Sequence, residues 1–346
     1  MAKNIVVFGA GAMGSSIAGY LTRAGIEITV IDPWHTHIAA IQKRGIHVTD
    51  PDGEFVAKPK ALHVDQVKNL GAPIDILFLA VKSPDTEWAT RYLAPYLAPD
   101  GYIVSAQNSL NEETISSIVG PEKVVGLVIT IAAAVYEPGE LLRYTAPADK
   151  LSYHPGELDG TDTPRLQEVA ELLSAAGLTK ATDNIWGTLW AKLAHNNMFN
   201  VTAGLTGLSS NPMFNNGTAR DVMMQIGRES VTVGEAYGIK FDNIAGISPE
   251  HFKNLNHGGA KAIEEAMLQI AAFRTGVRNS RPSMLQDILK GRRTEVDYLN
   301  GLIVRKGKEK NMPTPVNQAM LDAMHRLEDG EIKSDPSNLE LFKGLI

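Results

Sequence analysis

A glycine-rich pattern near the start of the chain constrains the fold more than any other feature. The pattern GxGxxG occupies positions 9–14, directly after the apolar run 4–8 and directly before an alanine-rich helical pattern. Between a strand and a helix, the glycines allow a tight turn, a close approach of a pyrophosphate to the backbone, and close helix–strand packing. The helix N-terminus also favours phosphates. The residues predicted to bind a dinucleotide are Gly9, Ala10, Gly11, Ala12, Met13 and Gly14. A glycine-rich turn without a ligand is the alternative.

The second apolar run, 27–31, indicates which dinucleotide is bound. It ends at Asp32, 18 residues after Gly14, and neither Arg nor Lys follows directly in Pro33-Trp34-His35. A carboxylate at this place accepts hydrogen bonds from the adenine ribose hydroxyls and repels a 2′-phosphate. NAD is therefore favoured over NADP. The alternative interpretation is that Asp32 only opens the next helix.

The bulk properties are typical of a soluble enzyme. The chain has 346 residues, a net charge of -6 and no cysteine. This acidic balance gives no basic footprint for nucleic acid, and the lack of cysteine excludes disulfides and thiolate chemistry. We found no histidine spacing typical of a metal site, no apolar stretch long enough for a bilayer, and no signal-peptide pattern in residues 1–9. The cytoplasm is the expected location.

The order of the predicted elements indicates two domains. The first half alternates apolar runs and helical patterns, which predicts a doubly wound, mainly parallel α/β sheet of the Rossmann type. The expected strands are 4–8, 27–31, 74–81, 102–105 and 124–129. The helical patterns of this half are 12–24, 34–43, 84–97, 111–118 and 162–176. Residues 130–158 are expected to form an antiparallel extension.

The second half of the chain is predicted to be all-helical. Its helical patterns are 184–198, 217–237, 258–275, 293–310 and 314–327. We therefore predict a dinucleotide-binding domain over 1–180 and a helical substrate domain over 181–346, with the ligand in the cleft between them, outside the strand ends. The apolar helices of 217–275 form either the domain core or the face of a homodimer.

Three polar residues form a stripe on the first of these helices. Lys192, Asn196 and Asn200 are spaced four residues apart, so a helix places them on one narrow face beside Leu189 and Leu193. Polar groups at the border of a buried face need partners. They either serve a ligand, or the lysine reaches solvent and the amides bond to loop backbone.

A carboxylate falls on the apolar face of the predicted helix 293–310. At 100° per residue, Glu295 lies between Leu299 and Leu302, where a charge usually has a buried partner. Lys192 is a plausible partner, and such a pair suits carbonyl reduction because lysine can protonate the oxygen as hydride reaches the carbon. A purely structural ion pair is the alternative.

Taken together, these motifs resemble the ketopantoate reductase (2-dehydropantoate 2-reductase) family of the 6-phosphogluconate-dehydrogenase-like superfamily. The resemblance rests on the glycine motif, Gln107-Asn108, the Lys192–Asn200 stripe, and a segment from Arg281-Pro282-Ser283 to Thr294-Glu295-Val296-Asp297-Tyr298-x-Asn300-Gly301. It covers essentially the whole chain in order, and its last segment is the most specific.

The resemblance implies a role for each matching residue. Lys192 matches the family's catalytic lysine, and Glu295 matches the carboxylate that holds this lysine or a substrate hydroxyl. The residues implied to bind substrate are Asn196, Asn200, Ser283 and Asn108. Asn108 is also placed near the nicotinamide, and Lys82 matches a lysine that contacts the cofactor. Three alternatives stay open: Ser283 starts a helix in a capping box with Gln286, Asn108 shapes the turn before a Ser109–Glu112 cap, and Lys82 is a solvated strand end.

The chain departs from the family at two places. Enzymes of pantothenate synthesis generally carry a basic residue near the end of the second strand, where this chain has Asp32. The family is commonly glycine-rich after the asparagine, where this chain has Ser109-Leu110-Asn111. The leading hypothesis is an NAD-linked oxidoreductase of a small 2-oxo or 2-hydroxy acid. A genuine NADPH-dependent ketopantoate reductase and an NAD(H) sensor without turnover are the alternatives.

Overall fold

The computed structural model describes residues 3–148, 150–273 and 282–346. The chain divides into two compact units, Met1–Ile185 and Trp186–Ile346; the sequence placed the boundary between 180 and 181. Arg281 and the end of the predicted helix 258–275 lie outside the described residues. In the described ranges, no helix is both long enough and apolar enough to cross a bilayer.

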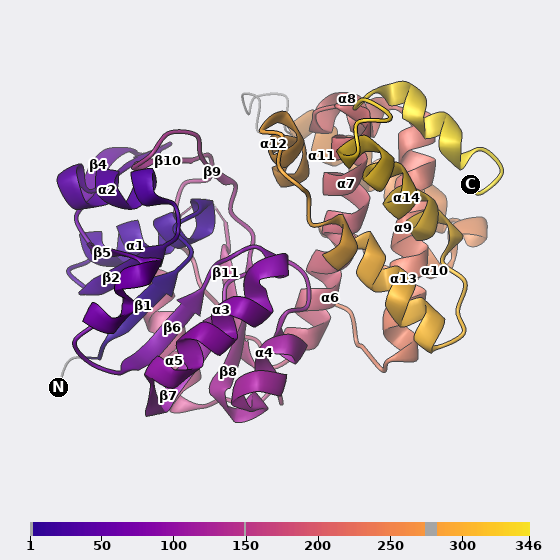
Figure 1. Ribbon diagram of the computed structural model, residues 1–346. Helices are drawn as coiled ribbons and strands as arrows, with labels where there is room; N and C mark the ends of the chain where they lie inside the picture. The colour runs from indigo at the N-terminus through magenta and orange to yellow at the C-terminus, as the bar shows by residue number, and fades with distance from the viewer. Residues whose placement is uncertain (1–2, 149, 274–281) are drawn as a thin grey trace. The chain divides into compact units, whose positions relative to one another are not determined.

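The first unit is built on a seven-stranded sheet (Figure 1). In spatial order its strands are β11 (Tyr153–Glu157), β8 (Val124–Ile129), β7 (Leu97–Ser105), β6 (Ile74–Leu79), β1 (Ile5–Phe8), β2 (Ile28–Asp32) and β5 (Lys60–His63). All neighbours pair in parallel except β11, which runs antiparallel to β8. Strands covered on both faces need continuous apolar runs, and the central strands have them. The predicted α/β class and mainly parallel sheet are confirmed.

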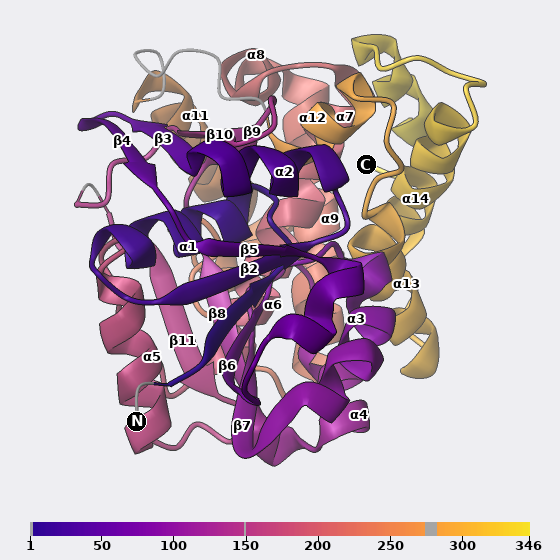
Figure 2. The same cartoon turned by 60° about the vertical axis from the view of Figure 1, so that its left-hand side comes forward.

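Helices cover both faces of this sheet (Figure 2). On one face, α1 (Ala12–Arg23), α2 (His35–Arg44) and α5 (Pro164–Ser174) pack onto the side chains of alternate strand residues such as Val7 and Phe78. On the other face, α3 (Thr86–Leu93), α4 (Glu112–Val119) and the 3-10 turn η1 (Val64–Asn69) pack onto the intervening residues. Short 3-10 turns are η2 (Ser83–Asp85), η3 (Ala94–Tyr96) and η4 (Pro121–Lys123).

A second, four-stranded sheet was not predicted. Its order is β4 (Gly53–Ala57), β3 (Ile46–Asp50), β10 (Glu140–Arg143) and β9 (Ala133–Val135). The expected antiparallel extension over 130–158 is therefore divided, because only β11 joins the large sheet. The sequence signal failed because β4 is short and largely exposed and so lacks a clear apolar pattern. The predicted helix 84–97 ends early as an α-helix, at Leu93, because Pro95 has no N–H to continue the α-helical hydrogen bonds, and the 3-10 turn η3 follows.

The second unit is helical throughout its described residues, as predicted. Its first helix, α6 (Ile185–His195), continues through a π-helical turn, η5 (Asn196–Asn200), into α7 (Val201–Thr206). The further α-helices are α8 (Ser210–Asn215), α9 (Gly217–Ala236), α10 (Pro249–Lys253), α11 (Gly259–Phe273), α12 (Ser283–Leu289), α13 (Asn300–Glu309) and α14 (Pro315–Glu328). The 3-10 turns are η6 (Leu255–His257), η8 (Val296–Tyr298) and η9 (Pro336–Phe342). Within this unit α9 packs against α8, α10, α14 and the π turn.

Candidate active site

The glycine motif forms the turn between β1 and α1. Its three glycines differ in what an added Cβ atom would meet. Gly9 has φ +99°, and a Cβ there would lie 2.7 Å from the Ala80 carbonyl oxygen. A Cβ on Gly14 would lie 1.8 Å from the Gly9 carbonyl oxygen. A Cβ on the exposed Gly11 would meet no atom within 4 Å. Gly9 and Gly14 are therefore required by the fold, whereas the space above Gly11 is available to a ligand.

Asp32, at the end of β2, holds this loop. Its Oδ2 accepts a hydrogen bond from the Ala10 N–H at 2.5 Å, and its Oδ1 accepts one from the Trp34 N–H at 2.7 Å. Trp34 occupies the N-cap position of α2, so Asp32 is not the N-cap residue itself, but it holds the start of that helix as well as the glycine loop. The carboxylate therefore sits beside the glycine loop with its charge fixed in place.

The buried side chain of His37 is linked to the glycine loop through Ser15. Ser15 Oγ donates to the Ala10 carbonyl at 2.7 Å and lies 3.4 Å from His37 Nε2. The Gly139 N–H donates to His37 Nδ1 at 2.9 Å, which requires that nitrogen to be unprotonated. Burial lowers the pKa of His37, in agreement with this neutral form. The small sheet is thus joined to the glycine loop through one imidazole ring.

The loops after β6 and β7 carry the predicted residues Lys82 and Asn108. Lys82 is exposed and precedes η2, while Asn108 is half-buried. The Asn108 carbonyl accepts a hydrogen bond from Ser83 Oγ at 3.3 Å and one from Asn111 Nδ2 at 2.6 Å. These contacts place the two loops side by side. Asn111 is the N-cap residue of α4, and its side chain makes no capping bond.

The second unit brings three of the predicted substrate residues together. Asn200 Nδ2 donates to Asn196 Oδ1 at 3.1 Å and to Ser283 Oγ at 3.3 Å. Asn196 is 1% exposed, whereas Ser283, the first residue of α12, is exposed. The N-cap of α12 is Pro282 and no side chain caps it, so the capping-box interpretation of Ser283 is wrong. Lys192 lies on α6, one turn before Asn196, and is half-buried.

The local structure around Glu295 corrects the helical prediction. Glu295 is 7% exposed, but it precedes η8, and α13 begins only at Asn300. The Thr294 N–H and hydroxyl both donate to Glu328 Oε1, at 2.7 and 2.6 Å, which satisfies this backbone outside a helix. The burial of Glu295 therefore comes from a turn and not from a helix face. Its pairing with Lys192 stays a prediction.

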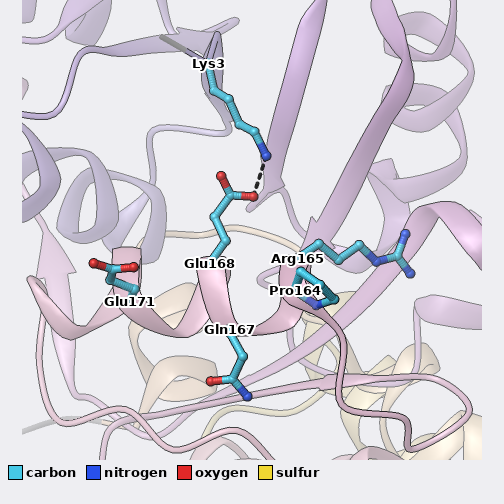
Figure 3. Close-up of a pocket in the computed structure, with 6 residues that line it drawn as sticks. All are labelled: Lys3, Pro164, Arg165, Gln167, Glu168 and Glu171. Atoms are coloured by element: carbon cyan, nitrogen blue, oxygen red, sulfur yellow. Dashed lines mark hydrogen bonds and ion pairs between the residues drawn. The ribbon is translucent and has the colours of Figure 1, made fainter. Parts of the chain in front are cut away.

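A surface hollow elsewhere in the first unit is separate from this machinery (Figure 3). It is lined by Lys3, Pro164, Arg165, Gln167, Glu168 and Glu171. Lys3 precedes β1, whereas the glycine loop follows β1, so the hollow lies at the opposite end of this strand from the glycine loop. Across it Lys3 Nζ and Glu168 Oε2 form an ion pair of 2.5 Å between partly exposed side chains. The hollow therefore plays no part in the candidate site.

Comparison with known proteins decides the family. Residues 5–156 match the family model "Ketopantoate reductase PanE/ApbA", and residues 184–328 match the model of its C-terminal domain. The chain belongs to the ketopantoate reductase family. The 2-dehydropantoate 2-reductase of Pyrococcus horikoshii is 30% identical over 315 residues, which cover 90% of this chain and 93% of that protein. The enzyme of that name from Archaeoglobus fulgidus is 27% identical and covers 95% and 99% of the two chains.

Several solved structures share the fold. The PanE/ApbA family ketopantoate reductase from Ralstonia eutropha JMP134 has a TM-score of 0.77 and 26% identity, and covers 95% of this chain and 99% of its own. D-mandelate dehydrogenase with NADH and anilino(oxo)acetate has a TM-score of 0.80 and 23% identity, and covers 94% and 99%. As a family member, this chain is an oxidoreductase that acts on a CH–OH group with a pyridine nucleotide.

Sequence reasoning missed several residues that hold the site in place. Asn111 and Thr86 belong to loops and helix starts, where no periodicity draws attention to them. Glu328, which holds the turn before Glu295, is 34 residues from its partner. The only available signal was the crowding of amide and hydroxyl side chains after two neighbouring strands.

Proposed function

We propose that this protein is an NAD-linked oxidoreductase that interconverts a small 2-oxo acid and the corresponding 2-hydroxy acid. The observation that carries the cofactor choice is the Asp32 carboxylate, which two backbone N–H groups hold beside the glycine loop. A fixed negative charge at the end of the second strand favours ribose hydroxyls and disfavours a 2′-phosphate.

The first unit would hold the dinucleotide. The open space over Gly11 and the N-terminus of α1 receive the pyrophosphate. A carboxylate has about four acceptor positions, so Asp32 retains capacity for ribose hydroxyls after accepting its two backbone bonds. Lys82 and Asn108, on adjoining loops after β6 and β7, lie at the carboxyl edge of the sheet, where ligands of doubly wound folds bind.

The second unit would hold the acid and move the proton. The amides of Asn196 and Asn200 and the hydroxyl of Ser283 offer donors to the carboxylate and oxygen atoms of a 2-oxo acid. A bound nicotinamide would supply the hydride for the carbonyl carbon in reduction and would accept it in oxidation. Lys192 gives its proton to the substrate oxygen during reduction and takes it back during oxidation. Glu295 would keep this lysine oriented.

A second candidate is NADPH-dependent reduction of 2-dehydropantoate. The names of relatives favour it, because eight of them, at 23–30% identity, are named 2-dehydropantoate 2-reductase. Asp32 is the feature of this chain that speaks against it.

The test measures cofactor affinity first and turnover second. NADH and NADPH are titrated by nucleotide fluorescence, and the protein is then assayed with a panel of 2-oxo acids that includes 2-dehydropantoate. We expect NADH to bind at least about tenfold tighter, and Asp32→Asn to reduce this preference by a similar factor because the charge is gone. Asp100→Asn, an exposed acid in β7, is the control. Tighter binding of NADPH with rapid turnover of 2-dehydropantoate would establish the second candidate instead.

A further inference from the structure

A network of buried side chains joins the loops that follow β6 and β7. Gln107 Nε2 donates to the Val81 carbonyl at 3.0 Å and to Thr86 Oγ1 at 2.8 Å. Thr86 Oγ1 in turn donates to Asn111 Oδ1 at 3.2 Å. The network therefore ties together the ends of two neighbouring parallel strands, at the edge of the sheet that carries Lys82 and Asn108.

Asn111 is the centre of this network. It is 3% exposed, and both functional ends of its amide have partners. Its Nδ2 donates to the Asn108 carbonyl at 2.6 Å and to Ser83 Oγ at 3.2 Å, while its Oδ1 accepts from Thr86. Two donors and one acceptor are needed at this point, and an amide offers both. A carboxylate of the same shape offers none of the donors.

The backbone next to Asn108 needs such support. Ser109 has φ +74°, in the left-handed region that residues with a Cβ rarely adopt. Strained backbone of this kind persists only when its surroundings hold it. Asn111 bonds to the carbonyl that precedes Ser109, so it fixes the turn from its N-terminal side.

We propose that Asn111 is a positioning residue for the redox reaction. Through the Asn108 carbonyl it sets where the Asn108 side chain stands, and through Ser83 it keeps this loop in register with the loop of Lys82. The inference rests on the proposed function, because Asn108 is assigned there to the nicotinamide and the substrate. It adds a residue that contacts neither ligand and acts only through Asn108 and Ser83.

The test compares Asn111→Asp with Thr90→Val in the full-length protein. Thr90 is fully buried in α3 and donates to the backbone carbonyl of Thr86 at 2.7 Å, so Thr90→Val costs a buried hydrogen bond but leaves every side-chain hydrogen bond of the network in place. We expect Asn111→Asp to lower kcat/KM for the best 2-oxo acid about 10- to 100-fold, since small misplacements of a positioning group have such effects. Thr90→Val should leave kcat and KM unchanged. Urea unfolding monitored by circular dichroism reports whether both variants are folded.

A second variant keeps the test decisive if Asn111→Asp does not fold. Thr86→Val preserves shape, removes only the hydroxyl between Gln107 and Asn111, and should lower kcat/KM about 3- to 10-fold. NADH affinity should change less than turnover in every variant. If Asn111→Asp is as active as Thr90→Val, the inference about Asn111 is wrong, while the proposed function stands. If Asn111→Asp does not fold, the same comparison is made with Thr86→Val. A wild-type protein that turns over no 2-oxo acid overturns the proposed function, and this inference with it.

Discussion

The two units build their parts of the candidate site in different ways. In the first unit the dinucleotide site is mostly backbone: a turn shaped by glycines, a helix N-terminus and one carboxylate that holds the turn. In the second unit the site consists of side chains from separate segments, namely the π turn, α12 and the turn before η8. A backbone site depends on a few glycines, whereas a side-chain site depends on the identity of each residue and on the packing that brings it in.

The π turn shows how the second kind of site is supported. The α-helical register is widened at 196–200, yet Asn200 still reaches both Asn196 and Ser283. Single π turns inside α-helices occur frequently at functional sites because they redirect side chains. Here the Asn200 amide at the end of the widened turn bonds to Ser283 at the start of α12 and to Asn196 at the start of the turn. The specificity of the second unit is therefore expected to lie in these side chains.

The largest effect that this comparison predicts is on Lys192. Lys192→Ala should lower kcat about 10²- to 10⁴-fold, because a positioned acid contributes a factor of that size. NADH affinity should be preserved, since the cofactor contacts belong to the first unit. Steady-state kinetics and fluorescence titration check the two parts. The control is Lys261→Ala, at a lysine with 82% of its side chain exposed. Retained turnover in Lys192→Ala would remove the proton-transfer role.

The next prediction distinguishes the glycine that the fold requires, Gly14, from the glycine that leaves room for a ligand, Gly11. Gly14→Ala should destabilise the protein by at least about 3 kcal/mol, because its Cβ would stand 1.8 Å from the Gly9 carbonyl oxygen and backbone cannot yield. Gly11→Ala should leave the unfolding free energy nearly unchanged and weaken NADH binding about tenfold or more. Urea denaturation and titration measure both. Unchanged NADH affinity in Gly11→Ala would show that no phosphate approaches there.

The backbone-built part was predictable from the sequence residue by residue. Its signal is contiguous: an apolar run, GxGxxG, a helix, and an acid at the end of the next apolar run. The structure places Gly9, Gly14 and Asp32 as that pattern requires, for the steric reasons given above. Such sites can be predicted from the sequence because their residues lie close together along the chain.

In the second unit the sequence named residues that the structure links by hydrogen bonds, but it did not show how they come together; their roles stay predictions. Asn196, Asn200 and Ser283 do meet, although the sequence could not show that a π turn and the start of α12 bring them together. Glu295 was expected on a helix face because its neighbours have helical spacing. Its backbone bends away instead, since Glu328, 33 residues later, holds the preceding Thr294. Long-range bonds of this kind leave no local pattern.

A smaller effect concerns a buried acid at the start of α4, next to Asn111. Glu112 is fully buried, and burial raises the pKa of its carboxyl from 4.5 to about 7. The folded state thus binds this proton more tightly than the unfolded state. The resulting stabilisation is complete below pH 4.5 and is lost as the pH rises through about 7.

Glu112→Gln should therefore match the wild type in stability below pH 4.5 and exceed it by roughly 3 kcal/mol at pH 8. Urea unfolding at several pH values measures the difference. Glu113→Gln, at the exposed neighbour, should show little of this pH dependence. A stability gain that is the same at every pH would mean that the proton on Glu112 is not linked to folding.

The smallest predicted effect contrasts strained backbone inside and outside the site. Ala245, in the second unit, has φ +54° in an exposed two-residue turn closed by mutual bonds of Ile244 and Ile247 at 2.8 and 3.0 Å. Turns of this type favour glycine or asparagine, so Ala245→Gly should stabilise the protein by about 0.5–1 kcal/mol and leave kcat unchanged. Ser109→Gly should also relieve strain, but it frees the loop that places Asn108, so kcat/KM should fall. Thermal unfolding and kinetics on both variants test the contrast. An equal loss of activity in both would mean that strain at Ser109 has no special link to the site.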